Sequence, residues 1–198
     1  MKVKICGITS PEDADAAIAA GADLLGFVFR LGTPRALDPA TSGWIRDVRG
    51  VERVGVFLDS PLDEVMRARD LLALDWVQLH GDEPDTYLEA LGEQVIRRVR
   101  VGFEIDWDRV AHLADRCLPL FDPGAGDGVA WAWEALEASP TGIRFGLAGG
   151  LTPDNVADAV RTVRPYLVDV SSGVEAAPAI KDHAKINDFI AAAREALG

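Results

Sequence analysis

The chain lacks several features that define large classes of protein. Its only cysteines, Cys6 and Cys117, are far apart and show no metal-ligand spacing, which argues against a disulfide framework and a cysteine-based zinc site. It has no run of about 18 apolar residues, and its start, MKVKICGITS, passes from lysine straight into a strand pattern without an apolar signal region. We therefore expect a cytoplasmic protein without a membrane anchor.

Positive charge is also scarce. The 198 residues include 20 Lys and Arg against 32 Asp and Glu, which gives a formal net charge of −12. Binding to nucleic acid or to an anionic membrane depends on clustered basic side chains, so neither is expected as a partner. An anionic small molecule would have to be held by local features. At this length one domain, residues 1–198, is the default, and we expect a monomer, with a homodimer as the alternative.

Short apolar runs alternate with longer amphipathic stretches along the whole chain. This alternation is typical of βα units around a parallel sheet, and eight units can be counted. The Gly-rich loops after the strands favour closure into a (β/α)8 barrel over an open doubly wound sheet, which the alternation alone also allows. The predicted strands are Val3 to Ile8, Leu24 to Phe29, Val54 to Leu58, Trp76 to Leu79, Val95 to Val99, Leu118 to Phe121, Ile143 to Ala148 and Leu167 to Val170. Helices are expected to begin near Pro11, Pro39, Pro61, Pro84, Asp106, Ala130, Pro153 and Lys181.

The first predicted strand carries a thiol at its end. In such a barrel the chemistry lies at the carboxyl ends of the strands. Within VKICGIT, Cys6 ends the first strand and shares the strand phase of Lys4, so both side chains should point into the barrel. A thiolate there can remove a carbon-bound proton, although a lone buried cysteine is more often a small hydrophobe. Lys4 and Asp169 are expected to form an interior ion pair, because the first and eighth strands become neighbours on closure.

A carboxyl group ends the sixth predicted strand. Asp122 follows the apolar run LPLF and precedes a Gly-rich loop, so it lies at the barrel mouth on a different part of the wall from Cys6. A carboxyl group partly buried there can act as a general acid. A turn-forming aspartate before Pro-Gly is an equally good interpretation. Asp169, in the eighth strand, lies near enough to the mouth to keep a secondary role open.

Two loops indicate a phosphate site. LAGGLTPDNV follows the seventh predicted strand and DVSSGV follows the eighth, and barrels of this kind commonly bind phosphate with these two loops. Backbone N–H groups can offset phosphate charge in spite of an acidic surface. Ordinary tight turns are the alternative. The residues concerned are Gly149, Gly150, Ser172 and Gly173.

Two further side chains at the mouth have a plausible role. Arg35 lies in the loop after the second strand, and its planar donor fork suits a substrate carboxylate, although such an arginine is often a solvated loop charge. His80 ends the fourth strand in VQLHGDE, where it either lines the mouth or satisfies a backbone carbonyl.

The ordered set of segments resembles a known family. KICGIT, GADLLGFVF with TPR, VGVF, VQLHGDE, LAGGLTPDNV and VDVSSGVE followed by KD are similar to the successive signatures of phosphoribosylanthranilate isomerases, in family order from residue 2 to residue 185. The resemblance implies a (β/α)8 barrel that needs no metal or organic cofactor. It also implies that Cys6 is the general base, Asp122 the general acid and Arg35 the group that receives the anthranilate carboxylate, with phosphate in the seventh and eighth loops.

The implied reaction is an Amadori rearrangement of N-(5-phosphoribosyl)anthranilate to 1-(2-carboxyphenylamino)-1-deoxyribulose 5-phosphate. One rival is a related aminoaldose-phosphate isomerase of histidine-type metabolism, but such barrels are generally longer and use paired aspartates, whereas the first strand here offers Cys6. A non-catalytic barrel that binds a phosphorylated ligand is the other rival. Retention of Cys6, Asp122 and Arg35 together argues against it.

The sixth loop departs from the family pattern. Asp122 is followed by Pro123, where Ser or Thr is more usual, and Gly126-Asp127-Gly128 stands where a Gly-Thr-Gly sequence is expected. One hypothesis is that the Asp127 carboxylate, on a folded-back loop, keeps Asp122 protonated near neutrality by like-charge repulsion, although loop carboxylates are usually exposed and screened. A solvated loop tip is the alternative.

Overall fold

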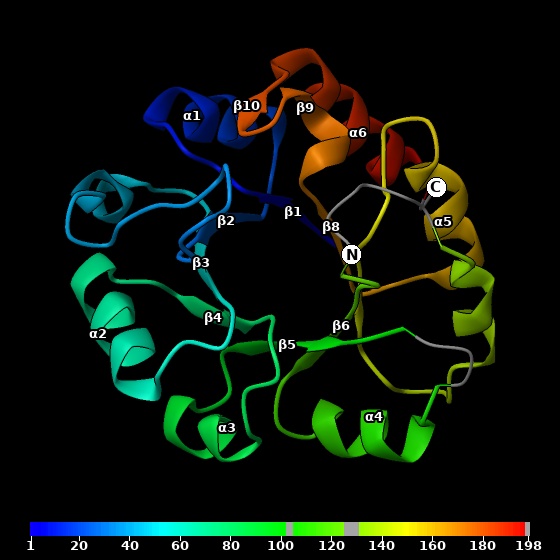
Figure 1. Cartoon of the computed structure of the whole chain (residues 1–198). Coiled ribbons are helices and arrows are strands. Elements are labelled where there is room, and N and C mark those ends of the chain that lie inside the picture. The colour runs from blue at the N-terminus through cyan, green and yellow to red at the C-terminus, as the bar shows by residue number, and fades with distance from the viewer. Residues whose placement is uncertain (102–104, 125–130, 197–198) are drawn as a thin grey trace.

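Eight parallel strands form a closed barrel in the computed structural model, which describes residues 1–101, 105–124 and 131–196 (Figure 1). The strands follow one another around the wall in chain order, and β8 pairs with β1 to close it. The predicted (β/α)8 fold is therefore confirmed. The strands are β1 (Lys2–Cys6), β2 (Leu24–Val28), β3 (Glu52–Phe57), β4 (Trp76–Leu79), β5 (Val95–Val99), β6 (Leu118–Phe121), β7 (Gly146–Leu147) and β8 (Leu167–Val170).

The alternation of side chains along each strand divides the core into two layers. Side chains on one face of the strands pack between the barrel and its helices, as Val3 and Ile5 of β1 do. Those on the other face fill the barrel interior with a separate apolar cluster: Leu24, Val54, Ile96, Leu120, Ala148 and Leu167. Polar residues of the same strand phase lie above this cluster, which places Cys6, Gln78 and Asp169 near the mouth.

Six α-helices cover the outside of the barrel in the described residues: α1 (Pro11–Ala20), α2 (Leu62–Leu72), α3 (Thr86–Leu91), α4 (Trp107–Ala114), α5 (Val156–Val163) and α6 (His183–Glu195). Several begin as the sequence predicts, because Ser10 caps α1 and Pro61 directly precedes α2. The helix predicted near Pro39 is wrong. Its place is taken by a short 3-10 helix, η1 (Gly43–Asp47), since Gly43 and the β-branched Thr41 and Val48 disfavour a longer α-helix.

The helix predicted after the sixth strand is also replaced by a 3-10 helix, η2 (Trp133–Ala138), and Ala130, where it was expected to begin, lies outside the described residues. The seventh strand is shorter than predicted, because Ile143 to Phe145 lie outside the ladder.

After β8 and the 3-10 helix η3 (Ser172–Val174) the chain forms an unpredicted hairpin, β9 (Glu175–Ala177) and β10 (Ile180–Lys181), seen above β8 in Figure 1. This hairpin brings Glu175 and Lys181 to the barrel mouth.

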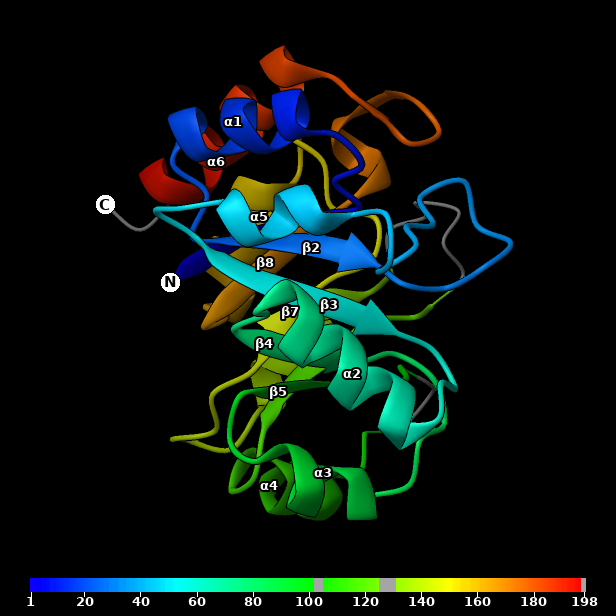
Figure 2. The same cartoon turned by 90° about the vertical axis from the view of Figure 1, so that its left-hand side faces the viewer.

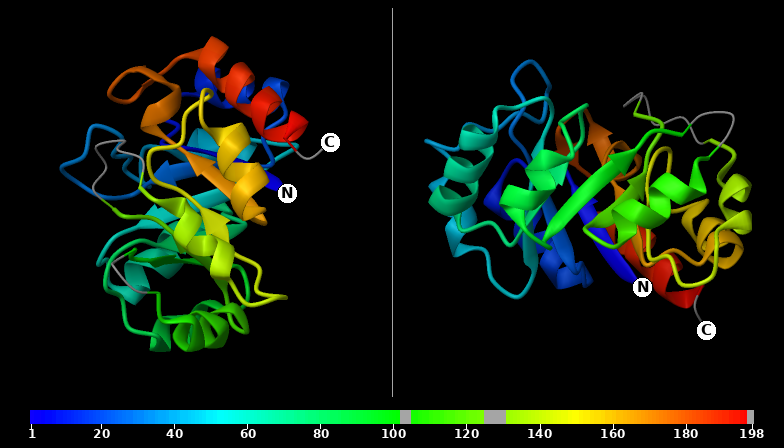
Figure 3. Two further views of the ribbon diagram at one scale, coloured as in Figure 1. Left: turned by 90° about the vertical axis from the view of Figure 1, so that its right-hand side faces the viewer. Right: turned by 90° about the horizontal axis from the view of Figure 1, so that it is seen from below.

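The strands all point toward one end of the barrel. In Figure 2 the arrowheads of β2 and β3 face the side from which the long loop after β2 projects, and Figure 3 places the N-terminus at the opposite end. The first and last helices lie side by side, where His183 Nε2 is 2.8 Å from Asp13 Oδ1. Within the described residues no helix is long and apolar enough to cross a membrane.

Candidate active site

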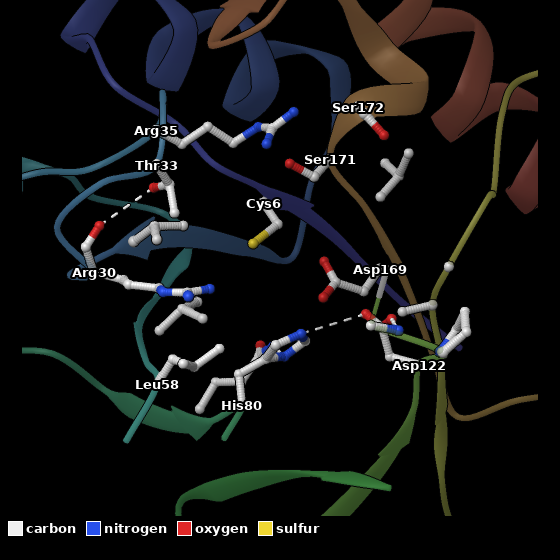
Figure 4. A pocket seen from close by; sticks show the side chains of 18 of the residues that line it. Cys6, Arg30, Thr33, Arg35, Leu58, His80, Asp122, Asp169, Ser171 and Ser172 are labelled. Atoms are coloured by element: carbon white, nitrogen blue, oxygen red, sulfur yellow. Dashed lines mark hydrogen bonds and ion pairs between the residues drawn. The ribbon is translucent and has the colours of Figure 1, made fainter. Parts of the chain in front are cut away.

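A cavity of about 390 Å³ opens at the carboxyl ends of the strands (Figure 4). Its walls come from the ends of β1, β2, β3, β4, β6, β7 and β8, so side chains far apart in the sequence meet there. The structure brings together the predicted catalytic and substrate-binding residues: Cys6, Arg35, His80, Asp122, Gly149, Gly150, Asp169, Ser172 and Gly173 line this one cavity.

Cys6 is the last residue of β1, and its buried side chain lies at the floor of the cavity. Gly7 follows with a φ of 74°, a left-handed conformation that lets the chain turn away over the mouth. Burial raises the pKa of the Cys6 thiol, because a low-dielectric surrounding disfavours the thiolate, and the nearby Lys4 ammonium acts against that increase. The balance between the thiol and the thiolate of Cys6 therefore depends on burial and on the Lys4 ammonium.

The predicted ion pair between Lys4 and Asp169 is confirmed. Lys4 Nζ lies 2.7 Å from Asp169 Oδ2, and the two residues are register partners on β1 and β8. Burial is the largest influence and disfavours the Lys4 charge, but Asp169 and Cys6 together outweigh it and the pKa of Lys4 is raised, so the ammonium keeps its proton. The barrel interior thus holds a fixed positive charge below the thiol.

Asp122 and His80 face each other across the cavity. The backbone N–H of Gly124 donates to Asp122 Oδ1 at 2.7 Å, and Asp122 Oδ2 is 3.8 Å from His80 Nε2. Burial lowers the pKa of His80 to about 4, and the charge of Arg98 contributes to the decrease although Asp122 opposes it. The imidazole is therefore neutral at neutral pH. Of the two alternatives that the sequence left open, the structure has His80 at the mouth, where its Nδ1 contacts the Gln78 amide at 3.1 Å.

Arg35 is held by a carboxylate that the sequence did not single out. Its Nε and Nη2 donate to the two oxygens of Glu175 at 2.7 and 2.6 Å. Lys181 Nζ donates to the same carboxylate at 2.9 Å and to the carbonyl of Ser171 at 3.0 Å. Burial disfavours the Glu175 charge, but the hydrogen bonds from Arg35 and Lys181 lower the pKa of Glu175. The guanidinium of Arg35 is consequently fixed at the rim of the cavity.

The seventh and eighth loops form another part of the rim. Gly149 and Gly150 have φ values of 86° and 70°, and their backbone N–H groups have no hydrogen-bond acceptor among the described residues. Gly173 approaches the seventh loop so closely that a Cβ there would overlap the carbonyl oxygen of Leu151. Glycine at position 173 is therefore required for the two loops to meet.

Both ends of the sixth loop contact the residues that follow β7. A Cβ on Gly149 would collide with the ring of Pro123, so the proline packs directly on the glycine loop. Trp131 Nε1 donates to the carbonyl of Ala148 at 3.0 Å. Asp127 belongs to residues 125–130, which lie outside the described part of the chain, so its predicted influence on Asp122 stays a prediction.

Sequence reasoning missed several residues that contribute to this site. Gln78 precedes His80 by two residues and therefore shares its strand phase, which is a signal that was available. Arg30 lies at the start of the loop after β2 and lines the cavity, and Figure 4 shows its guanidinium directed into it. Glu175 and Lys181 lie in segments that read as loop, so only the hairpin reveals that they reach the mouth.

Comparison with known proteins gives a consistent result. A family model described as N-(5'phosphoribosyl)anthranilate (PRA) isomerase matches residues 3–192. An N-(5'-phosphoribosyl)anthranilate isomerase of Trichlorobacter lovleyi is 46% identical, over 100% of both chains. The crystal structure of phosphoribosyl anthranilate isomerase from Thermotoga maritima has a TM-score of 0.88 at 36% identity and covers 98% of this chain and 99% of its own. A similar structure, with a TM-score of 0.84, 36% identity and the same coverage, contains reduced 1-(o-carboxyphenylamino)-1-deoxyribulose 5-phosphate.

Proposed function

The chain belongs to the N-(5'-phosphoribosyl)anthranilate isomerase family, and we propose that its barrel mouth catalyses the isomerisation with Cys6 as base and Asp122 as acid. The protein is an isomerase of tryptophan biosynthesis that converts N-(5-phosphoribosyl)anthranilate to 1-(2-carboxyphenylamino)-1-deoxyribulose 5-phosphate. One observation carries the assignment of roles: a thiol from β1 and a carboxyl group from the end of β6 line a single cavity with the two glycine loops.

The reaction needs one proton donor and one proton acceptor. Asp122 protonates the ring oxygen of the ribose, which opens the furanose and leaves a Schiff base with a cationic nitrogen. That cation makes the hydrogen on C2 acidic, and the Cys6 thiolate removes it as a proton. The resulting enolamine tautomerises to the ketone, so C1 is reduced and C2 oxidised within one molecule.

Arg35 is assigned to the carboxylate of the anthranilate ring. Its contacts with Glu175 use Nε and one edge of Nη2, which leaves the donors of Nη1 for a second carboxylate. A guanidinium already fixed by one carboxylate loses little freedom on binding another, which favours affinity. Arg30 and the neutral His80 face the same cavity, where the remaining polar groups of the substrate must fit. Asp169 is assigned to the same substrate-binding surface.

Turnover of the authentic substrate tests the function directly. The purified protein is expected to remove phosphoribosylanthranilate at the same rate with and without a chelator, because both proposed proton-transfer groups are side chains. The measurement is the loss of substrate fluorescence. The Asp122→Asn protein serves as the control for uncatalysed loss. Activity that vanishes with the chelator and returns with a divalent ion would contradict this mechanism.

The phosphate assignment predicts a defect that is specific to substrate binding. Gly173→Ala should raise KM, and the inhibition constant of inorganic phosphate, about tenfold, which corresponds to about 1.4 kcal/mol. The added methyl group must displace the carbonyl of Leu151 and so separate the seventh and eighth loops. We expect kcat to change less, since Cys6 and Asp122 are untouched.

Gly43→Ala is the matched control, because a Cβ there would meet no atom within 4 Å and Gly43 does not line the cavity. It should leave both constants unchanged. If phosphate inhibits Gly173→Ala as strongly as it inhibits the unmodified protein, these loops do not hold the phosphate.

The two rival functions are less well supported than this one. Full-length identity of 46% to a named isomerase favours it over a histidine-type enzyme. A non-catalytic barrel would have no need to keep a thiol and a carboxyl group on one cavity. The monomeric state and the cytoplasmic location expected from the sequence stay predictions.

A further inference from the structure

A buried ammonium group lies directly behind the thiol of Cys6. Lys4 precedes Cys6 by two residues on β1, so the two side chains are neighbours on the inner face of the strand. The Lys4 side chain is completely buried. Burying a charge is costly, and the contact with Asp169 offsets that cost without explaining why a charged pair occupies this place.

Gly26 shows how close the ammonium and the thiol are. This residue is the register partner of Cys6 on β2. A Cβ at Gly26 would lie 2.7 Å from Cys6 Sγ and 3.0 Å from Lys4 Nζ. The two atoms therefore flank the same point, and no side chain from β2 separates them.

The contact with Asp169 leaves part of the ammonium available. An ammonium group has three donors, and Asp169 accepts from it with one oxygen only, Oδ2 at 2.7 Å. The other oxygen, Oδ1, is buried without a hydrogen-bond partner among the described residues. The ion pair is thus monodentate, and Asp169 does not accept a hydrogen bond from every N–H of the Lys4 ammonium.

We propose that Lys4 is a positioning residue for the proposed base, Cys6. The Lys4 ammonium stabilises the Cys6 thiolate, so that the thiolate is present when the substrate binds. This role rests on the proposed function of Cys6 and adds to the structural ion pair. Burial raises the pKa of Cys6, and among the charges that lower it Lys4 is the strongest. Without Lys4 the thiolate would be rarer at neutral pH, and the rate of proton removal would fall in proportion.

Other charged groups surround Cys6, but each differs from Lys4. Asp169 on β8 disfavours the thiolate, whereas Lys181 on β10 favours it more weakly than Lys4 does. Lys181 and Arg35 both donate to Glu175, whose single carboxylate offsets part of their charge. Arg30, His80 and Asp122 face the thiol from the other walls of the cavity.

The test is a titration of the Cys6 thiol without substrate. In a Cys117→Ser background only Cys6 contributes to the ultraviolet absorbance of thiolate. Lys4→Met should move this titration to higher pH by about one unit or more, the scale for loss of a charge within a few ångströms. The value of kcat/KM should fall about tenfold near neutral pH and recover as the pH rises. A purely structural defect would show no such alkaline recovery.

Lys4→Met leaves a buried aspartate without its partner, so a second comparison guards against misfolding. The Asp169→Asn protein and the Lys4→Met/Asp169→Asn protein both lack the carboxylate, and they differ only in the ammonium. The thiol of the double variant should titrate at higher pH than that of Asp169→Asn. Equal titration curves in these folded proteins would overturn the proposal. Failure of the proposed function is distinguishable, because it would appear as absent turnover in the unmodified protein.

Discussion

Replacement of Asp122 by asparagine is expected to lower kcat about 10²-fold or more while the chain remains folded, the usual scale for loss of a general acid. An amide cannot donate a proton to the ribose ring oxygen, so ring opening becomes limiting. The local turn should survive, because the backbone N–H of Gly124 donates to Asp122 Oδ1 and an asparagine oxygen accepts the same hydrogen bond. KM should change little, because the proposed carboxylate and phosphate contacts lie elsewhere.

Asp38→Asn is the matched control for this substitution. Asp38 Oδ1 accepts from the backbone N–H of Ala40 at 2.9 Å, the same local turn that Asp122 makes with Gly124, but Asp38 does not line the cavity. Steady-state kinetics of both variants therefore separate loss of the acid from disturbance of a turn. Near-normal kcat in a folded Asp122→Asn protein would exclude Asp122 as the acid.

The fold could be predicted from the sequence wherever an apolar run stands between clear breaks. The strands Trp76–Leu79, Val95–Val99, Leu118–Phe121 and Leu167–Val170 have the predicted bounds. The helix predicted to begin near Pro39 does not form, because Gly43 follows too soon for a long helix. The hairpin β9–β10 has no run of large apolar side chains, and it depends on Ala179 in a left-handed conformation, with a φ of 65°, which the sequence does not indicate.

The site could be predicted to the extent that strand ends and strand phase determine it. Cys6, His80, Asp122 and Asp169 lie at or next to the carboxyl ends of strands and line the cavity for that reason. Their partners depend on distances across the barrel. Glu175 is 140 residues from Arg35 in the chain, and no local pattern indicates that it binds the guanidinium.

The sequence predicted only the ion pair with Asp169 for Lys4, because its other close contact depends on a third strand. The pairing with Asp169 follows from the neighbouring first and eighth strands and was predicted. The approach of Lys4 Nζ to Cys6 Sγ requires the missing side chain of Gly26 on a third strand. A glycine in the middle of a strand can indicate such a close approach, but it does not say which atoms meet there.

Replacement of Cys6 by serine is expected to have the largest effect of all, a fall in kcat of about 10³-fold, within the range for loss of a general base. A serine hydroxyl is a far weaker acid than a thiol, so even beside Lys4 its anion is not populated at neutral pH. The oxygen is smaller than the sulfur and fits the space above Gly26, so the barrel should fold normally. Substrate binding should persist, and the measurement is kcat and KM with circular dichroism to verify folding.

Cys117→Ser is the control that separates chemistry from the mere loss of a thiol. Cys117 is also buried, its Sγ donates to the carbonyl of Leu113 at 3.3 Å, and burial raises its pKa to about 11. It does not line the cavity, so its replacement should leave kcat unchanged. A folded Cys6→Ser protein that turns over substrate like the unmodified one would remove Cys6 from the mechanism. In that case Cys6 would be a small buried hydrophobic residue, and another group at the mouth would have to accept the C2 proton.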